Sequence, residues 1–228
     1  RDRKLKETEE LIVDCLGLFV EVTASGFQSA PGESVKSTIE ILNRAQADIT
    51  LRSIRASGVG WDSLFTLTLA HNRPQLLNVS AEVEQASEFS DPYWLKAPHG
   101  TGLFTVTDKK KNGMPQNSPA VIFTFELNIG DESLTLRRPL IYKWVDPVKG
   151  ELWRPFEIVP PVTVNLSETV MVFGTHEPRQ VTLLIRSSSG VPQNGTVQVQ
   201  VPKGWKADPA SVAFELPGRG EEQARVIN

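Results

Sequence analysis

Most of the chain alternates apolar and polar residues with a period of two, which is the pattern of a strand buried on one face. The alternation is clear over residues 35–43 and 64–69. Short stretches of this kind recur between Gly, Pro and Asn turns, with no helical pattern between them. Such a succession predicts antiparallel β-sandwiches. The expected strands are 18–23, 35–43, 49–54, 64–69, 102–106, 120–127, 134–142, 162–166, 180–186, 195–201, 212–216 and 224–227.

The first residues follow a different period and predict a helix over 4–16, with Gly17 at the position of a helix C-cap. The apolar residues at spacings of three and four form one stripe of this helix: Leu5, Leu11, Ile12 and Cys15. A short, charged helix cannot be a domain by itself, so we expect the stripe to pack against another part of the protein. We also expect Cys15 to be a small buried side chain rather than a reactive thiol.

The β pattern is interrupted once, which divides the chain into two domains. A length of 228 residues exceeds that of one typical domain. The stretch 151–161 ends in paired prolines, and proline cannot join the interior of a sheet ladder, so this stretch predicts a linker. In the second domain, Trp205 follows a turn glycine and is expected to fold back onto the core. The prediction is an all-β protein of two tandem immunoglobulin-like antiparallel sandwiches: a helix over 1–17, a first sandwich over 18–150, a linker over 151–161 and a small second sandwich over 162–228.

Composition and charge narrow the classes of function. The 24 Lys and Arg against 27 Asp and Glu give a net charge of −3, which predicts no basic patch for nucleic acid. No stretch approaches the roughly 20 apolar residues of a transmembrane helix, so we expect no membrane span. The single cysteine excludes an internal disulfide and a multi-cysteine zinc site.

Motifs for catalysis are missing from the sequence. It has no G-x-S-x-G elbow and no glycine-rich phosphate loop that opens a helix. We therefore assign no catalytic residue, no metal and no cofactor. The three histidines lie in separate segments without metal-ligand spacing: His71, His99 and His176. An independent enzyme would need loop side chains to converge in a cleft, and the candidates are Glu88, Asp91 and His99.

The aromatic segment 91–95 is the best candidate for a contact surface. Tyr93 and Trp94 are two large rings among loop-forming residues, and His99 follows closely. Rings presented on a loop can stack against a sugar face or a partner protein. Trp61, after a glycine-rich turn, is a further candidate ligand-binding residue. The alternative for Trp94 is a structural role in which it closes one end of the sandwich.

Short motifs of the chain resemble those of two known families. Residues 162–168 and 201–209 resemble the small immunoglobulin-like sandwich that accompanies carbohydrate-binding modules in bacterial glycosidases. Over nearly the whole chain, the order of motifs looks like that of the C-terminal half of bacterial LmbE/PIG-L-type deacetylases. The segments that carry this second resemblance are 17–21, 30–33, 92–95, 138–144, 146–151 and 159–161.

The enzymes of the deacetylase family remove N-acetyl groups from amino sugars, with a metal held by a His-Pro-Asp-Asp type motif. This chain lacks that motif, so no catalytic residue is carried over. The resemblance implies a non-catalytic accessory region of a longer polypeptide, which targets glycan or the cell envelope or docks on an upstream catalytic domain. The alternative is a structural spacer or protein-interaction module without a ligand. We expect an extracytoplasmic location, periplasmic or secreted, and the sequence leaves the oligomeric state open.

Overall fold

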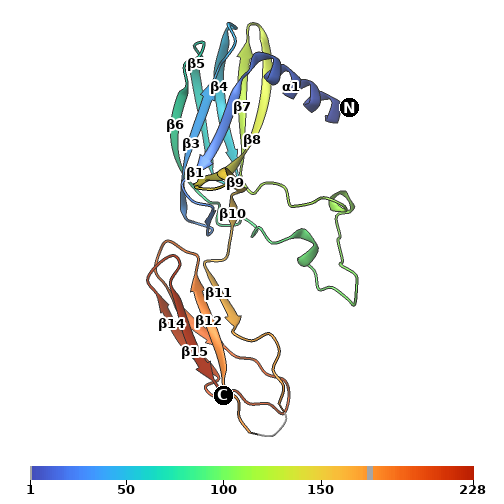
Figure 1. The fold of residues 1–228 in the computed structure, drawn as a ribbon, viewed down its shortest axis with the longest axis vertical. Helices are drawn as coiled ribbons and strands as arrows, with labels where there is room; N and C mark the ends of the chain where they lie inside the picture. Colours follow the sequence, from blue (N-terminus) through green and yellow to red (C-terminus); the bar gives the residue numbers. More distant parts are fainter. Residues whose placement is uncertain (1, 174–176) are drawn as a thin grey trace. The chain divides into compact units, whose positions relative to one another are not determined.

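The computed structural model describes residues 2–173 and 177–228, and His176 lies outside them. The protein is all-β with one N-terminal helix, as expected (Figure 1). It divides into two compact units, Arg1–Ile158 and Val159–Asn228. The elements of the first unit are α1 (Asp2–Leu16), β1 (Phe19–Ala24), β2 (Gln28–Ser29), β3 (Ser34–Leu42), β4 (Ile49–Ser57), β5 (Trp61–Thr68), β6 (Gln75–Glu82), β7 (Ile122–Ile129), β8 (Glu132–Asp146), β9 (Gly150–Pro155) and β10 (Glu157–Ile158). Those of the second unit are β11 (Val162–Leu166), β12 (Val181–Ser187), β13 (Gln193–Gln198), β14 (Ser211–Leu216) and β15 (Glu222–Ile227).

The first unit is a sandwich whose two layers share one long strand. The strand order is β5-β4-β7-β8-β1-β3-β6, with β9 paired to the far part of β8. Over Glu132–Pro139, β8 pairs antiparallel with β7 in one layer. From Leu140 onward it runs beside β1 and β9 in the other layer. The strand order thus places β4, β5 and β7 in one layer and β1, β3 and β6 in the other.

Alternation of side chains fills the space between the layers. Successive strand residues point to opposite faces, so every second residue of β3 and β7 enters the core. The largest fully buried side chains include Phe123 and Phe125 from one layer and Ile39 and Ile41 from the other. The period-two pattern of residues 35–43 therefore predicted the buried face of β3 correctly.

The change of layer occurs at Pro139 and is fixed by Arg138. Proline lacks an N–H, so it cannot extend the ladder as a donor. Next to it, the Arg138 Nε donates to the Val20 carbonyl of β1 at 3.2 Å. The same guanidinium holds both carboxylate oxygens of Glu10 in α1, at 2.9 and 3.2 Å. One side chain thus ties helix α1 and strand β1 to β8.

Helix α1 ends as the sequence predicted, but its apolar stripe is not buried. Gly17 has φ +56°, and the Leu18 amide donates to the Val13 carbonyl at 3.1 Å, which is a Schellman C-cap. Val13 is buried and Leu16 packs against the core. The expectation of a buried Cys15 is wrong, because its thiol is on the exposed side of the helix. The side chains of Leu5, Leu11 and Ile12 are exposed as well.

The strands correct three further expectations and add one strand that was not predicted. Residues 102–106 lie in an irregular excursion between β6 and β7, and their one ladder contact among the described residues is a bridge from Leu103 to Gly100. Residues 75–82 form the unpredicted strand β6, paired with β3. Much of the expected linker belongs to β9 and β10, and the division falls after Ile158. The sheets are not wholly antiparallel, since β1 with β8 and β2 with β10 are parallel pairs.

The second unit has a much smaller core. The sheet β11-β12-β15 and the hairpin β13-β14 bury side chains such as Leu183, Ile185 and Leu216. Trp205 was expected in this core, but 51% of it is exposed. Its ring instead meets the Phe173 ring edge-on, with centroids 4.7 Å apart. The turn that carries Trp205 therefore presents the indole to solvent rather than to the core.

We expect Phe125→Ala to lower the free energy of unfolding of the first unit by about 3–5 kcal/mol, because it removes a fully buried ring and leaves a cavity. The matched control is Leu64→Ala on β5, where an 86% exposed side chain predicts a change within about 0.5 kcal/mol. Urea unfolding followed by tryptophan fluorescence measures both, because Trp61 packs against this core. Equal losses for the two variants would contradict the placement of the core.

Candidate functional site

The predicted contact residues Tyr93 and Trp94 lie on a short 3₁₀ turn, Tyr93–Leu95, within the long excursion between β6 and β7. Their rings meet edge-to-face with centroids 4.9 Å apart, and both are half-buried. Figure 1 shows the excursion leaving the sandwich and returning to it. Neither ring belongs to the hydrophobic core described for the first unit, so the structural alternative of Trp94 closing the sandwich gains no support.

Tyr93 holds the two arms of this excursion together. Its hydroxyl donates to the Met114 carbonyl at 3.0 Å, and its amide donates to the Asn117 Oδ1 at 3.0 Å. Asn117 in turn donates to the Asp91 carbonyl at 2.6 Å. These bonds bring residues more than 20 positions apart into contact. The hydrogen bonds of Tyr93 therefore position the loop. Trp94 is the ring that is more available for contact with a ligand.

The other two predicted residues lie elsewhere. The His99 ring packs against Phe104, with centroids 5.4 Å apart, and its Nδ1 lies 3.2 Å from the Gly100 carbonyl oxygen. Trp61 begins β5, where it packs against Phe123 and the core. The contacts of Trp61 are those of a structural residue. The four predicted residues do not gather into one site.

A hollow of about 260 Å³ lies at the base of the excursion. Glu88, Lys96 and Lys111 line it, and the Glu88 carboxylate forms an ion pair with the Lys96 ammonium. The hydrogen bond and charge of Lys96, with a smaller effect of Lys111, hold the pKa of Glu88 below its usual value. Asp91 and His99, the other candidates for an enzymatic cleft, do not line this hollow.

The structure brings together a second aromatic group, here called the ring cluster: Phe27, Tyr142, Trp144 and the guanidinium of Arg154. The Tyr142 and Trp144 rings stack with centroids 5.8 Å apart and an angle of 19°. Phe27 meets Tyr142 edge-on at 6.0 Å. The Arg154 guanidinium lies over the Phe27 ring, 4.5 Å from its centroid, in a cation–π contact. Phe27 and Trp144 each keep more than a third of their surface exposed.

Strand geometry explains why these rings share a face. Tyr142 and Trp144 continue the parity of the buried Leu140, but they lie beyond the end of the core. Arg154 is the cross-strand partner of Tyr142, so its side chain is on the same face. Phe27 is held nearby because its carbonyl accepts the Glu157 amide at 3.0 Å. The face of β8 that enters the core is thus continued, beyond the core, by a partly exposed aromatic surface.

The hairpin that carries the ring cluster is closed by Asp146. Its Oδ1 accepts the amides of Val148 and Lys149 at 2.9 and 2.8 Å. These two bonds favour the ionised carboxylate and hold the pKa of Asp146 below its usual value. Gly150, with φ +80°, completes the turn in a conformation that other residues rarely adopt.

The opposite face of the same hairpin carries charge and a further ring. Lys143 lies between two carboxylates, 2.6 Å from Glu151 and 3.0 Å from Glu21. The hydrogen bond that Lys143 donates to Glu151, with the help of Glu21, raises the pKa of Lys143 despite its partial burial. Trp153 is the cross-strand partner of Lys143 and is 61% exposed. The hairpin therefore presents apolar surface on both faces.

Chemically, the ring cluster is suited to stacking rather than to catalysis. Aromatic faces attract C–H groups, and the charged rim of Arg154 and Glu157, joined at 2.9 Å, offers hydrogen bonds to hydroxyls. Sequence reasoning did not select this cluster. The available signal was the Tyr-x-Trp spacing at the end of a long strand, with Trp153 shortly after it. Phe27 and Arg154 carried no signal, because only the fold brings them to Tyr142.

Other classes of site have little support in the described residues. No group of three or more His, Cys, Asp or Glu side chains within residues 2–173 and 177–228 is placed to hold a metal ion. None of the described helices has the length and apolar run needed to cross a lipid bilayer. In comparisons with known proteins, the chain matches no family model and no curated protein.

The lowered pKa of Asp146 gives a pH-dependent hairpin. The stabilisation is complete above the unfolded pKa, about 3.9, and is lost as the pH falls through the lower folded pKa. We expect the Val148 and Lys149 amides to lose protection from hydrogen exchange in that acid range. The Asp146→Asn variant keeps an acceptor oxygen without a titrating charge, so its amides should not show this acid transition. An equal acid transition in both proteins would refute the role of the carboxylate.

Proposed function

We propose that this chain is a non-catalytic accessory region that binds carbohydrate through the ring cluster and serves an amino-sugar deacetylase domain of a longer polypeptide. The observation that carries the carbohydrate part is the stacked pair of Tyr142 and Trp144, partly open to solvent at the end of the sandwich. The deacetylase part rests on the order of sequence motifs. A role on envelope glycan would place the region outside the cytoplasm.

Contacts within the chain hold the rings of the cluster in place. Tyr142 is held between Phe27 on one side and Trp144 on the other, and Arg154 covers Phe27. Side chains that are already ordered lose little entropy when a ligand binds. The exposed part of Trp144 can therefore take the C–H face of a sugar ring without rearrangement. This is the physical support for a glycan site here rather than at Trp94.

Charge at the rim fits a neutral or amino-sugar chain better than a polyanion. Arg154 is paired with Glu157, and Lys143 with Glu21 and Glu151, so the hairpin has no surplus of positive charge among its ion pairs. Paired ions of this kind can still exchange hydrogen bonds with hydroxyl and acetamido groups. N-acetylglucosamine oligomers and peptidoglycan fragments have this chemistry, and they match the substrates implied by the resemblance.

The alternative function is a spacer, and one observation favours it. Two compact units are joined at Val159, directly before the rigid pair Pro160 and Pro161. A spacer needs no ligand, and its aromatic residues would contribute only to stability. The two functions therefore predict different effects of removing a ring. A glycan-binding region would lose affinity, whereas a spacer would lose only stability.

The test is a calorimetric titration of the chain with N-acetylglucosamine oligomers and peptidoglycan fragments. We expect wild-type binding and a loss of affinity on the order of tenfold or more in Trp144→Ala, because the stacking surface is removed. Trp94→Ala is the matched control, since it removes a half-buried indole outside the ring cluster and should bind as the wild type does. Thermal unfolding of both variants separates binding from stability.

Two outcomes would count against the proposal. No heat of binding and no change in fluorescence up to millimolar ligand would remove the glycan site and favour the spacer. Loss of binding in Trp94→Ala with retention in Trp144→Ala would move the site to the excursion, where sequence analysis placed it.

A further inference from the structure

Helix α1 carries an apolar stripe that the described part of the chain leaves uncovered. Leu5 and Leu11 are each 60% exposed, Ile12 is 40% exposed and Cys15 is exposed. At 100° per residue these side chains share one side of the helix, with Thr8 at its centre. The buried Val13 points the other way, toward the sandwich. One side of the helix therefore packs on the first unit, and an apolar side is exposed to solvent.

The attachment of α1 is concentrated in its second half. Val13, Leu16 and the Glu10–Arg138 ion pair hold the last two turns. In the first turns, the side-chain bonds given for the described residues stay within the helix: the ion pairs of Arg3 and Lys4 with Glu7, and the bond that Thr8 donates to the Lys4 carbonyl. An isolated helix of about 15 residues is marginal in water, and most helices gain their stability from packing of the apolar side. A partner on the stripe would supply that packing.

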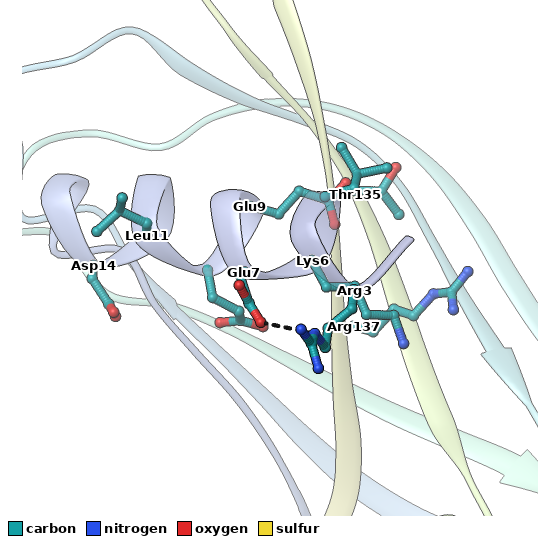
Figure 2. Close-up of a pocket in the computed structure, with 10 residues that line it drawn as sticks. Arg3, Lys6, Glu7, Glu9, Leu11, Asp14, Thr135 and Arg137 are labelled. Atoms are coloured by element: carbon teal, nitrogen blue, oxygen red, sulfur yellow. Dashed lines mark ion pairs between the residues drawn. The ribbon is translucent and has the colours of Figure 1, made fainter. Parts of the chain in front are cut away.

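The two ends of the helix carry opposite charges on one flank of the stripe. Lys4, Glu7, Leu11 and Asp14 follow spacings of three, four and three, so they lie along the same flank. Arg3 and Lys4 share the single carboxylate of Glu7, whereas Asp14 has no ion pair within the described residues. Figure 2 shows the Arg3–Glu7 pair toward one end and Asp14 toward the other. The flank is basic at its start and acidic at its end.

A groove beside the helix continues this pattern. It has a volume of about 1070 Å³, and Leu5 and Leu11 of α1 line it together with Thr135 and Arg137 of β8. Arg137 lines the same groove as Arg3, and Figure 2 shows both toward the end of the helix away from Asp14. A partner that carries carboxylates where this end carries cations would fit the groove and the flank together.

We propose that this partner is α1 of a second copy of the chain, packed antiparallel on the stripe. A two-fold axis near residue 10 places Leu5 opposite the partner helix's residue 15 and Thr8 opposite its residue 12. The same operation brings the basic start of each helix, with Arg3 and Lys4, beside the acidic end that carries Asp14. A self-complementary surface of this kind is what a two-fold dimer requires. The inference does not depend on the proposed glycan site.

The first test is the mass of the chain by sedimentation over about two decades of protein concentration. We expect a reversible monomer–dimer equilibrium that Leu11→Glu weakens on the order of a hundredfold, because each dimer would bury two such positions. Leu64→Glu is the matched control: it places the same charge on an exposed leucine of β5 and should leave the equilibrium unchanged. A monomer at every concentration would overturn the proposal and leave the stripe to another polypeptide segment.

The second test uses the single thiol to read the direction of packing. In the antiparallel pair, Leu5→Cys should form intermolecular disulfides with the native Cys15 under mild oxidation. Within one helix these positions are about 15 Å apart, too far for an internal bond. The wild type and the double variant Leu5→Cys with Cys15→Ser should crosslink far less. Efficient Cys15–Cys15 crosslinking in the wild type would indicate parallel packing and overturn the arrangement.

Discussion

The first unit depends on the passage of β8 from one layer to the other. A sandwich needs some connection that fixes the two sheets relative to each other, and here the connection is a continuous strand whose ladder changes partner at Pro139. Arg138 occupies the position where the change occurs and bonds to β1 and α1 at once. This one crossing encloses the core between the layers and provides the attachment of helix α1. It also carries the β8–β9 hairpin beyond the core.

The crossing also explains why the aromatic surface at the end of β8 is ordered although it is not buried. A strand that merely ended at Leu140 would leave no support for rings beyond the core. Because β8 continues to Asp146 and pairs with β9, Tyr142 and Trp144 are carried outward on a hydrogen-bonded hairpin. The rings of the long excursion have a different support, which is a set of side-chain bonds centred on Tyr93. Strand-mounted rings are held more rigidly than loop-mounted ones, and rigid presentation favours recognition.

Much of the fold could be predicted from the sequence because burial imposes a period on it. The alternation in β3, the strand at β7 and the C-cap at Gly17 were predicted correctly. Strand β6 was missed because the adjacent Leu76 and Leu77 break the period, and Leu76 is in fact 62% exposed. The run 102–106 was wrongly expected as a strand for the opposite reason. Its residues favour a strand, but in the described part of the chain they pair with no strand. Cys15 was expected to be buried because of its place on the apolar stripe, and Trp205 because of the turn glycine before it. Each lies on a side that the fold leaves open. Contacts that join distant segments, such as Phe27 with Tyr142, leave no periodic trace in the sequence.

The excursion between β6 and β7 begins and ends at nearly the same place. Val83 bridges to Val59, and the tight approach of Ala120 to Gly58, where a Cβ would lie 2.4 Å from the carbonyl oxygen, fixes the return. A segment whose ends are pinned side by side is a closed insert, and the entropic cost of closing it grows only with the logarithm of its length. The sandwich can therefore exchange this insert for longer, shorter or unrelated ones without disturbing its interior. Gly58, which the returning chain approaches this closely, is a residue that such inserts must leave unchanged.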